Sequence, residues 1–508
     1  MLKQLSQRPT ALNGLLIVVV SLLVAVLIGV RIGSAPLTYQ DMITGLALAA
    51  FIIILIQKRG LEIGFFVWIM AFILGFRTIK VTAPLIVDQL ANGGQVSTRY
   101  LTTGKPPDIV LHPLFLVIFL LLGLILLQRA VNWQVRIVWL IPIPLIIFSI
   151  FWIWGWVRGA EAGKYWLDMF SELMPFLMLP AIFIVTASIL QKQSLWKPAI
   201  TVLFGVGVFI GFLGLLEILF PNIVHVIPGY TSADTTFAYA QDGFQRATFT
   251  FFGETGASFI IALVLPAIIP LWSWYKRPWA RALLAVCCGI GVIGIYISGH
   301  RSLWLMMILV TIALLLLRGN WGRTLILAVM MAVGYNFLPA TAQKRAETLF
   351  SALQGKYEDN SSQDRVNRSQ GAIQSILTDP LGLGWTGAGW VHDDFLQIAA
   401  NLGVIPGALF ALWYLFTLVK ISRAFYESSD PLTHSLVGLF MVGGILLLTE
   451  PLSVLPQYIT PVWFVWALVE TKLGQIAEQR GSYSANKAHS TYSDLQLPGS
   501  SSGMSGIR

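Results

Sequence analysis

Apolar runs of about 20 residues recur along most of the 508-residue chain, and polar segments separate them. An α-helix needs roughly this length to cross the hydrocarbon core of a bilayer. The pattern predicts an all-α, polytopic integral membrane protein with about 14 transmembrane helices, or 12 if two of the shorter runs do not span. The predicted spans are residues 12–30, 41–56, 61–76, 109–127, 137–156, 170–190, 198–220, 257–274, 282–297, 302–317, 324–337, 395–419, 436–448 and 458–469.

Three long polar segments interrupt this pattern, at residues 77–107, 221–256 and 338–394. We expect the last of them, a large loop, to carry short helices, because its residues 366–377 would place several apolar side chains on one side of a helix. The predicted organisation has four parts. They are 1–245 with N-terminal spans and outer loops, 246–419 as a core that includes loop 338–394, 420–470 with the last spans, and 471–508 as a disordered cytoplasmic tail.

Lysine and arginine residues concentrate in the short connections between predicted spans. Short basic connections favour the cytoplasmic side of a membrane, so we expect both termini in the cytoplasm and the three long polar segments on the outer side. The first apolar run is long, and no small-residue cleavage site precedes Arg31. We therefore expect an uncleaved first span rather than a signal peptide.

Composition narrows the possible classes of function. Hydrophobic residues make up 56% of the chain and charged residues 11%, whereas soluble domains have roughly 25% charged residues. The formal net charge is +9, but most of the basic residues lie in the short loops that set topology, so we expect no nucleic-acid partner. Cys287 and Cys288 are adjacent within an apolar run and support neither a disulfide framework nor a zinc site.

Four polar clusters on the predicted outer side call for an explanation. They are Arg246 with Glu254, the tight turn at His300 and Arg301, the pair Arg365 and Arg368, and the run His392, Asp393 and Asp394. Most have a plain structural interpretation as an interfacial arginine, a solvated pair one helical turn apart, an interface histidine, or an aspartate that caps a helix. Arg301 is harder to explain in this way, because its charge lies at membrane depth on the side where basic residues are rare.

A functional interpretation joins the four clusters into one site. Arginines gathered on one side of the membrane would bind a phosphate or diphosphate, because guanidinium groups match phosphate oxygens bidentately. A histidine has an ordinary pKa close to neutrality, so His392 could take a proton from an incoming hydroxyl. We expect no metal, because the outer loops contain neither a His-x-x-x-His cluster nor an Asp-x-Asp pair. The glycine-rich stretch at 382–389 lacks the preceding strand and the Lys-Ser/Thr pair of a P-loop.

In order and spacing, these motifs resemble the O-antigen ligase and polymerase superfamily of bacterial membrane glycosyltransferases. The resemblance covers roughly residues 246–418. The motifs that carry it are Ser298-Gly299-His300-Arg301, Arg365 with Arg368, Pro380-Leu381-Gly382-Leu383-Gly384, His392-Asp393, Asn401-Leu402-Gly403-Val404-Ile405-Pro406-Gly407, and the segment from Arg246 to Gly253 and Glu254. Asp393, Asn401 and Glu254 stand where the family more often has Asn, Glu and Asn.

The resemblance implies an enzyme of the bacterial inner membrane. It would move an oligosaccharide from undecaprenyl diphosphate to an acceptor hydroxyl on the periplasmic face, where loop 338–394 would lie, without a metal or another cofactor. Carried over residue by residue, the expected catalytic residues are His392, Arg301 and Arg246. The two arginines, with Arg368, would bind the diphosphate, and His392 would activate the acceptor or stabilise the departing phosphate. The expected substrate-binding residues are Arg365, Arg368, Asp393 and His300.

The resemblance leaves the acceptor open. It is the lipid A core in a ligase, a second lipid-linked glycan in a polymerase, and a Ser or Thr in a protein glycosylase. Two other classes of function are a solute transporter and a non-catalytic component that works with other polysaccharide assembly proteins in the bilayer. Transporters place charged residues near the membrane midplane. Here the candidate residues cluster in outer loops, and only Glu62 and Glu217 are in-span carboxylates, which favours the enzyme.

Overall fold

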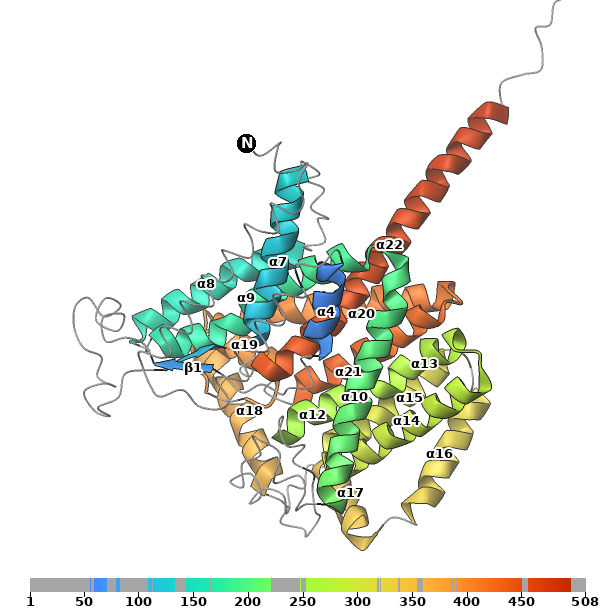
Figure 1. Ribbon diagram of the computed structural model, residues 1–508. Coiled ribbons are helices and arrows are strands. Elements are labelled where there is room, and N and C mark those ends of the chain that lie inside the picture. Colours follow the sequence, from blue (N-terminus) through green and yellow to red (C-terminus); the bar gives the residue numbers. More distant parts are fainter. Residues whose placement is uncertain are drawn as a thin grey trace, which may run out of the picture.

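The computed structural model is shown in Figure 1. It describes residues 55, 59–70, 79–82, 108–111, 113–132, 143–163, 166–220, 247, 253–317, 319, 321–336, 339–353, 360–385, 387–389, 391–449 and 456–494. The predicted span 12–30, most of 41–56, most of the polar segments 77–107 and 221–256, and the end of the tail lie outside the described residues. Arg246 also lies outside them.

The described residues are almost entirely helical, as the apolar pattern predicted. The helices are α4 Gly60–Met70, α7 Pro113–Asn132, α8 Ile143–Glu161, α9 Trp166–Leu190, η2 Gln193–Leu195, α10 Trp196–Leu219, α12 Gly253–Ala262, α13 Val264–Trp274, α14 Pro278–Ile297, α15 Arg301–Leu317, α16 Trp321–Tyr335, α17 Ala340–Leu353, α18 Asn360–Thr378, α19 Asp394–Leu402, α20 Val404–Glu427, α21 Pro431–Thr449 and α22 Pro456–Asp494. Two short strands, β1 Ile79–Thr82 and β2 Asp108–Leu111, pair antiparallel at the two ends of the predicted outer segment 77–107. Their β-branched residues suit a strand, although the sequence analysis predicted none there.

Five helical segments within the described residues are long and apolar enough to cross a membrane. They are Gln193–Leu219, Ala257–Trp274, Pro278–Ile297, Val404–Glu427 and Pro431–Thr449. Each overlaps a predicted span, and together they indicate a membrane protein. Prolines begin α7, α14, α21 and α22, where the missing N–H costs no intrahelical hydrogen bond.

Aromatic side chains fill the core between α9, α20 and α22. Trp466 lies 4.3 Å from Trp413 and 5.6 Å from Phe410, measured between ring centroids. Trp463 contacts Phe176 of α9 at 6.1 Å. Aromatic pairs of this kind contribute about 0.5–1.5 kcal/mol each beyond the area that they bury. The polar loop after α18 packs on this core through Trp385, whose ring centroid lies 5.1 Å from that of Phe176.

Glycines let α10 approach two of its neighbours closely. Gly207 and Gly211 form a Gly-x-x-x-Gly pair on α10. A Cβ atom added to Gly207 would lie 2.7 Å from the carbonyl oxygen of Ile260, and one added to Gly294 of α14 would lie 2.9 Å from the Cα of Gly211. Small residues at this spacing are typical of membrane helix interfaces, where close backbone packing replaces the hydrophobic effect.

The prediction of one continuous span at 395–419 was wrong, because the chain breaks into α19 and α20 at Gly403. This glycine has a φ of +111°, and a Cβ there would lie 2.9 Å from the carbonyl oxygen of Leu381. The break leaves α19 as a short helix with three polar residues on one face. All three are buried: Asp394, Gln397 and Asn401.

The prediction of disorder throughout 471–508 was also wrong in part, because α22 continues to Asp494. Figure 1 shows the C-terminal half of this helix, in red, extending away from the other helices. An ion pair between Arg480 and Glu427 joins it to the end of α20 before it leaves the body of the protein.

Candidate functional site

The start of α19 fixes the position of His392. Asp393 is the N-cap of the helix: its Oδ1 accepts hydrogen bonds from the backbone N–H groups of Phe395 at 2.9 Å and Leu396 at 3.1 Å. A cap of this kind stabilises a helix end by about 1 kcal/mol. The structure therefore gives Asp393 the capping role that the sequence analysis considered beside substrate binding. His392 is the residue just before the cap.

The buried polar face of α19 holds the loop that leads to the histidine. Gln397 accepts a hydrogen bond from the N–H of Val391 at 2.7 Å and donates one to the carbonyl oxygen of Gly389 at 2.8 Å. Asn401 accepts a hydrogen bond from the N–H of Ala388 at 3.0 Å. These side chains satisfy backbone groups that would otherwise be costly to enclose. They fix the loop as far as the residue before the histidine.

The glycine turn before this loop is clamped between α8 and α19. The N–H of Gly384 donates to the carbonyl oxygen of Asn401 at 2.9 Å, and the N–H of Trp385 donates to that of Gly155 at 3.0 Å. Gly384 has a φ of +79°, and a Cβ there would lie 2.2 Å from the backbone nitrogen of Gly159. The glycine-rich stretch is therefore a tightly packed support, because backbone meets backbone where a side chain would not fit.

Arg158, at the end of α8, completes this clamp. Its Nη2 lies 2.6 Å from Oδ2 of Asp379, and its Nε donates to the carbonyl oxygen of Gly382 at 3.3 Å. Its Nη1 also pairs with Glu161 at 3.1 Å. Charge-assisted hydrogen bonds of this kind are among the stronger ones in proteins. Arg158 therefore joins α8 to the turn that follows α18.

Helix α18 packs against α19 and carries the two arginines of the loop. Ala372 contacts Val391 and Ala400 in a small buried cluster. The helix ends at Thr378, two residues before Pro380, because the residue before a proline disfavours helical geometry. The prediction of a helix within loop 338–394 is therefore confirmed.

Arg365 and Arg368 lie one turn apart on α18 but have different surroundings. Arg365 is half-buried, and its Nη1 donates at 3.1 Å to the carbonyl oxygen of Thr449, the last residue of α21. A cation at a helix C-terminus complements the partial negative charge there. The Arg368 side chain is 42% exposed, and its Nε lies 2.7 Å from Oδ2 of Asp364. The interpretation of Arg365 and Arg368 as a solvated pair therefore fits Arg368 alone, and its exposed ion pair with Asp364 contributes little to stability.

The structure brings His392 together with both arginines. Burial lowers the pKa of His392 from 6.5 to about 4, and the charges of Arg365 and Arg368 act in the same direction, whereas Asp364 opposes them. The imidazole is therefore neutral at pH 7. Its Nδ1 is enclosed and has no hydrogen-bond partner in the described part of the chain. Nε2 is not enclosed in this way.

The lowered pKa of His392 makes the free energy of unfolding depend on pH. In the unfolded chain the imidazole has its ordinary pKa near 6.5, so between pH 6.5 and about 4 the unfolded state binds more protons than the folded state. The contribution of His392 to stability is fully present above about pH 6.5, and it is lost as the pH falls through about 4.

We expect the imidazole of His392 to titrate near pH 4 in the folded protein. Replacing Arg365 and Arg368 together by Gln should raise this pKa, because it removes two charges that oppose protonation. Replacing Asp364 by Asn should lower it instead, which makes this variant a control of opposite sign. Hydrogen–deuterium exchange at the imidazole C2 position, followed by mass spectrometry over a pH series, measures each value. Equal titration midpoints of His392 in the unmodified protein and in both variants would contradict the placement of these charges around the imidazole.

Arg301 and His300 lie on a separate turn between α14 and α15. Gly299 has a φ of +62° in this turn, and the N–H of His300 donates to Oγ of Ser298 at 3.3 Å. Arg301 is the first residue of α15 and is half-buried. The charges that shift the pKa of His392 do not include that of Arg301. The predicted site residues are carried by two parts of the fold: one cluster on α18 and just before α19, and a second cluster on the turn between α14 and α15.

A backbone hydrogen bond connects the segment near Arg246 to this second cluster. The N–H of Ala247 donates to the carbonyl oxygen of Ile297 at 3.1 Å, and Ala247 is fully buried. The residue that follows Arg246 is therefore fixed at the end of α14, immediately before the turn.

Several residues that build the site were missed by the sequence analysis. Arg158 and Asp379 lie 221 positions apart, and nothing in the sequence pairs them. Gln397 could have been found, because Asp394, Gln397 and Asn401 repeat at helical spacing within a largely apolar segment. A polar face on such a helix indicates buried hydrogen bonding rather than lipid contact.

The cluster around His392 can bind an anion and accept a proton. Two guanidinium groups supply charge and hydrogen-bond donors, and the neutral imidazole supplies an open lone pair. No group of three or more His, Cys, Asp or Glu side chains that could hold a metal occurs within the described ranges.

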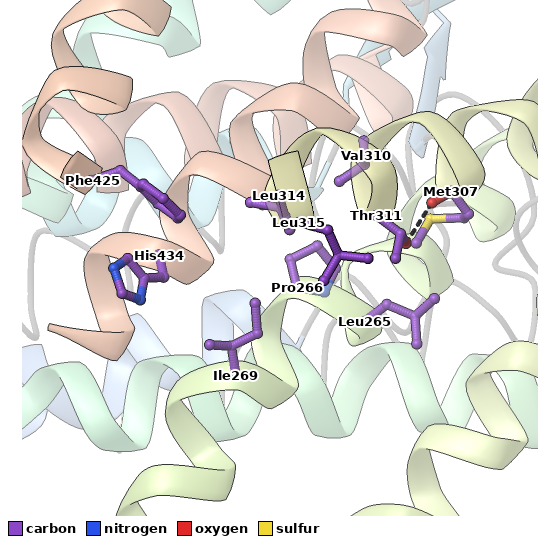
Figure 2. Close-up of a pocket in the computed structure, with 10 residues that line it drawn as sticks. All are labelled: Leu265, Pro266, Ile269, Met307, Val310, Thr311, Leu314, Leu315, Phe425 and His434. Atoms are coloured by element: carbon purple, nitrogen blue, oxygen red, sulfur yellow. Dashed lines mark hydrogen bonds between the residues drawn. The ribbon is translucent and has the colours of Figure 1, made fainter. Parts of the chain in front are cut away.

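A cavity of about 260 Å³ lies elsewhere, between α13, α15, α20 and α21. Figure 2 shows apolar side chains along most of it, with Phe425 and His434 at one end and Met307 and Val310 at the other. His434 hydrogen-bonds through its Nε2 to the carbonyl oxygen of Ser428 at 3.0 Å. No lining residue belongs to the cluster around His392.

No protein-family model matches the chain, and no curated protein matches it. The function must therefore be inferred from the site and from its motifs.

Proposed function

We propose that the protein is a metal-independent membrane glycosyltransferase. It transfers an oligosaccharide from undecaprenyl diphosphate to an acceptor hydroxyl on the periplasmic face, as a polysaccharide polymerase or an O-antigen ligase. The observation that carries this proposal is that α18, which carries Arg365 and Arg368, packs against the segment around His392, and the charges of both arginines act on its neutral imidazole. The motif resemblance supplies the reaction and the donor.

In this proposal the arginines bind the diphosphate of the donor. Arg368 is exposed enough to exchange its pairing with Asp364 for a phosphate, and Arg365 has one nitrogen committed to Thr449. Negative charge grows on the diphosphate as the glycosidic bond breaks, so cations placed there stabilise the transition state more than the ground state. Arg301 and Arg246 extend the cationic surface from the α14–α15 turn.

His392 acts as the base. A bound diphosphate compensates the two arginine charges, which raises the proton affinity of the imidazole when the substrate is in place. Nε2 then takes the proton from the acceptor hydroxyl while the acceptor oxygen bonds to the anomeric carbon. The bond from that carbon to the phosphate oxygen breaks, and undecaprenyl diphosphate leaves with the electron pair.

In this proposal the chain crosses the bacterial inner membrane about 14 times. Both termini lie in the cytoplasm, and loop 338–394 lies in the periplasm. The observed break at Gly403 supports a loop that returns to the membrane surface before α20 begins. This arrangement would place His392 at the level of the lipid head groups, where the diphosphate of the donor lies.

A transfer assay tests the proposal. Purified protein in liposomes receives an undecaprenyl-diphosphate oligosaccharide, a chelator, and in turn a lipid A core, a second lipid-linked glycan or a Ser/Thr peptide. Mass spectrometry of the products identifies the acceptor. We expect transfer to one acceptor in the presence of chelator. Failure to transfer to any acceptor, by protein shown to be folded, would contradict the proposal and favour solute transport, which uptake into the same liposomes measures.

A further inference from the structure

Helix α18 has an apolar side that is exposed in the described part of the chain. The face that includes Ala372 and Ile376 packs toward α19. Ile373 and Leu377 lie on an adjacent side, one turn apart, and are 46% and 79% exposed. Charged residues of the helix, Arg368 and Asp364, lie on the other side, because each residue advances by about 100° around the axis. Large apolar residues at this exposure are unusual on a helix that is otherwise polar.

The exposed apolar surface continues from α18 onto α8. Leu381, just after α18, is 58% exposed, and its carbonyl oxygen accepts a hydrogen bond at 3.1 Å from Nε1 of Trp154. Trp154 lies on the side of α8 that displays Ile150, Ile153 and Val157, all exposed. α8 packs against α20, one of the helices long enough to span a membrane. The exposed residues of α8 are therefore those expected to face lipid, and the surface from Trp154 to Leu377 adjoins them.

We propose that α18 is seated on the lipid bilayer, with Ile373, Leu377 and Leu381 inserted at the boundary between head groups and acyl chains. A tryptophan that bonds to the protein through its N–H and keeps its ring exposed is typical of this boundary. An amphipathic helix binds there through its apolar side and keeps its polar side in water. Arg365 and Arg368 lie one to three turns from the inserted residues on the same helix. The bilayer would therefore hold both guanidinium groups at head-group depth.

Fluorescent labels on adjacent residues test this seating. In a background with Cys287 and Cys288 replaced by Ala, single cysteines at Leu377 and at Thr378 receive an environment-sensitive dye. Thr378 is exposed, neighbours Leu377 in depth and points about 100° away around the axis, so it is the matched control. The labelled proteins are reconstituted in dilute liposomes with or without doxyl lipid, and iodide is added as the aqueous quencher.

We expect several-fold stronger quenching by doxyl lipid at Leu377→Cys than at Thr378→Cys, and the reverse order for iodide. Equal access of iodide to both positions would overturn the proposal. Protection of Leu377→Cys from iodide without quenching by doxyl lipid would also overturn it, because it would mean that protein, such as a second copy of the chain, covers the surface. The seating does not depend on the transfer reaction, so neither result is affected if the proposed activity fails.

Discussion

Replacing His392 by Ala is expected to lower the rate of glycan transfer by about 10²–10⁴-fold, the usual contribution of a general base. The imidazole is neutral, its Nε2 is not enclosed as Nδ1 is, and the charges of Arg365 and Arg368 act on it. The assay is the chelator-resistant transfer reaction in liposomes, with donor binding measured separately. Donor binding should change little, because the histidine acts on the acceptor.

The arginines should affect donor binding as well as the rate, unlike His392. Replacing Arg368 by Gln weakens donor binding as well as the rate, since one charge-assisted contact to the diphosphate is lost. Lys at this position should restore part of the loss, because the charge returns without the bidentate geometry.

His434→Ala is the matched control for these variants. It removes a histidine from the separate cavity of Figure 2 and should leave transfer unchanged. Full transfer by folded His392→Ala protein would remove the histidine from the mechanism. A loss of the same size in His434→Ala would show that the assay reports general damage.

Gly384→Ala should destabilise the protein by several kcal/mol. The positive φ of this residue costs a non-glycine residue about 1–3 kcal/mol, and the added Cβ would meet the backbone of Gly159 at 2.2 Å, which neither segment can relieve easily. Since a folded domain has only about 5–15 kcal/mol in total, we expect a much lower unfolding temperature and loss of monodisperse protein in size-exclusion chromatography.

Gly389→Ala separates the cost of the positive φ from the cost of the steric clash. Gly389 also has a positive φ, +66°, but a Cβ there meets no atom within 4 Å. It should therefore show only the smaller backbone penalty, and Gly371→Ala, in open space within α18, should show none. Equal unfolding temperatures for Gly384→Ala and Gly389→Ala would contradict the close packing of the turn against α8.

The sequence predicted the apolar helices well, because the length and hydropathy of a membrane span are local properties. It also predicted that Arg365, Arg368 and His392 belong together, from their order and from chemistry. It could not predict the break at Gly403, since a glycine within an apolar run is compatible with a continuous helix, and only the close approach of Leu381 requires the break.

The contacts that hold the site in place could not be predicted from the sequence for a different reason. The ion pair of Arg158 with Asp379 and the insertion of Trp385 beside Trp152 join residues that are more than 200 positions apart. Such contacts depend on how the helices pack, and periodicity carries no information about them.

The long helix α22 has a practical consequence for measurements on this protein. Beyond Arg480, whose guanidinium pairs with Glu427, the helix continues to Asp494 and would carry a fluorophore attached near Asp494 roughly 20 Å outward at about 1.5 Å per residue. A reporter fused there would sit clear of the helical body. Energy transfer between this reporter and a membrane dye would then measure how far the end of the helix lies from the bilayer. A quencher added on one side of the vesicle would show on which side of the membrane the reporter lies.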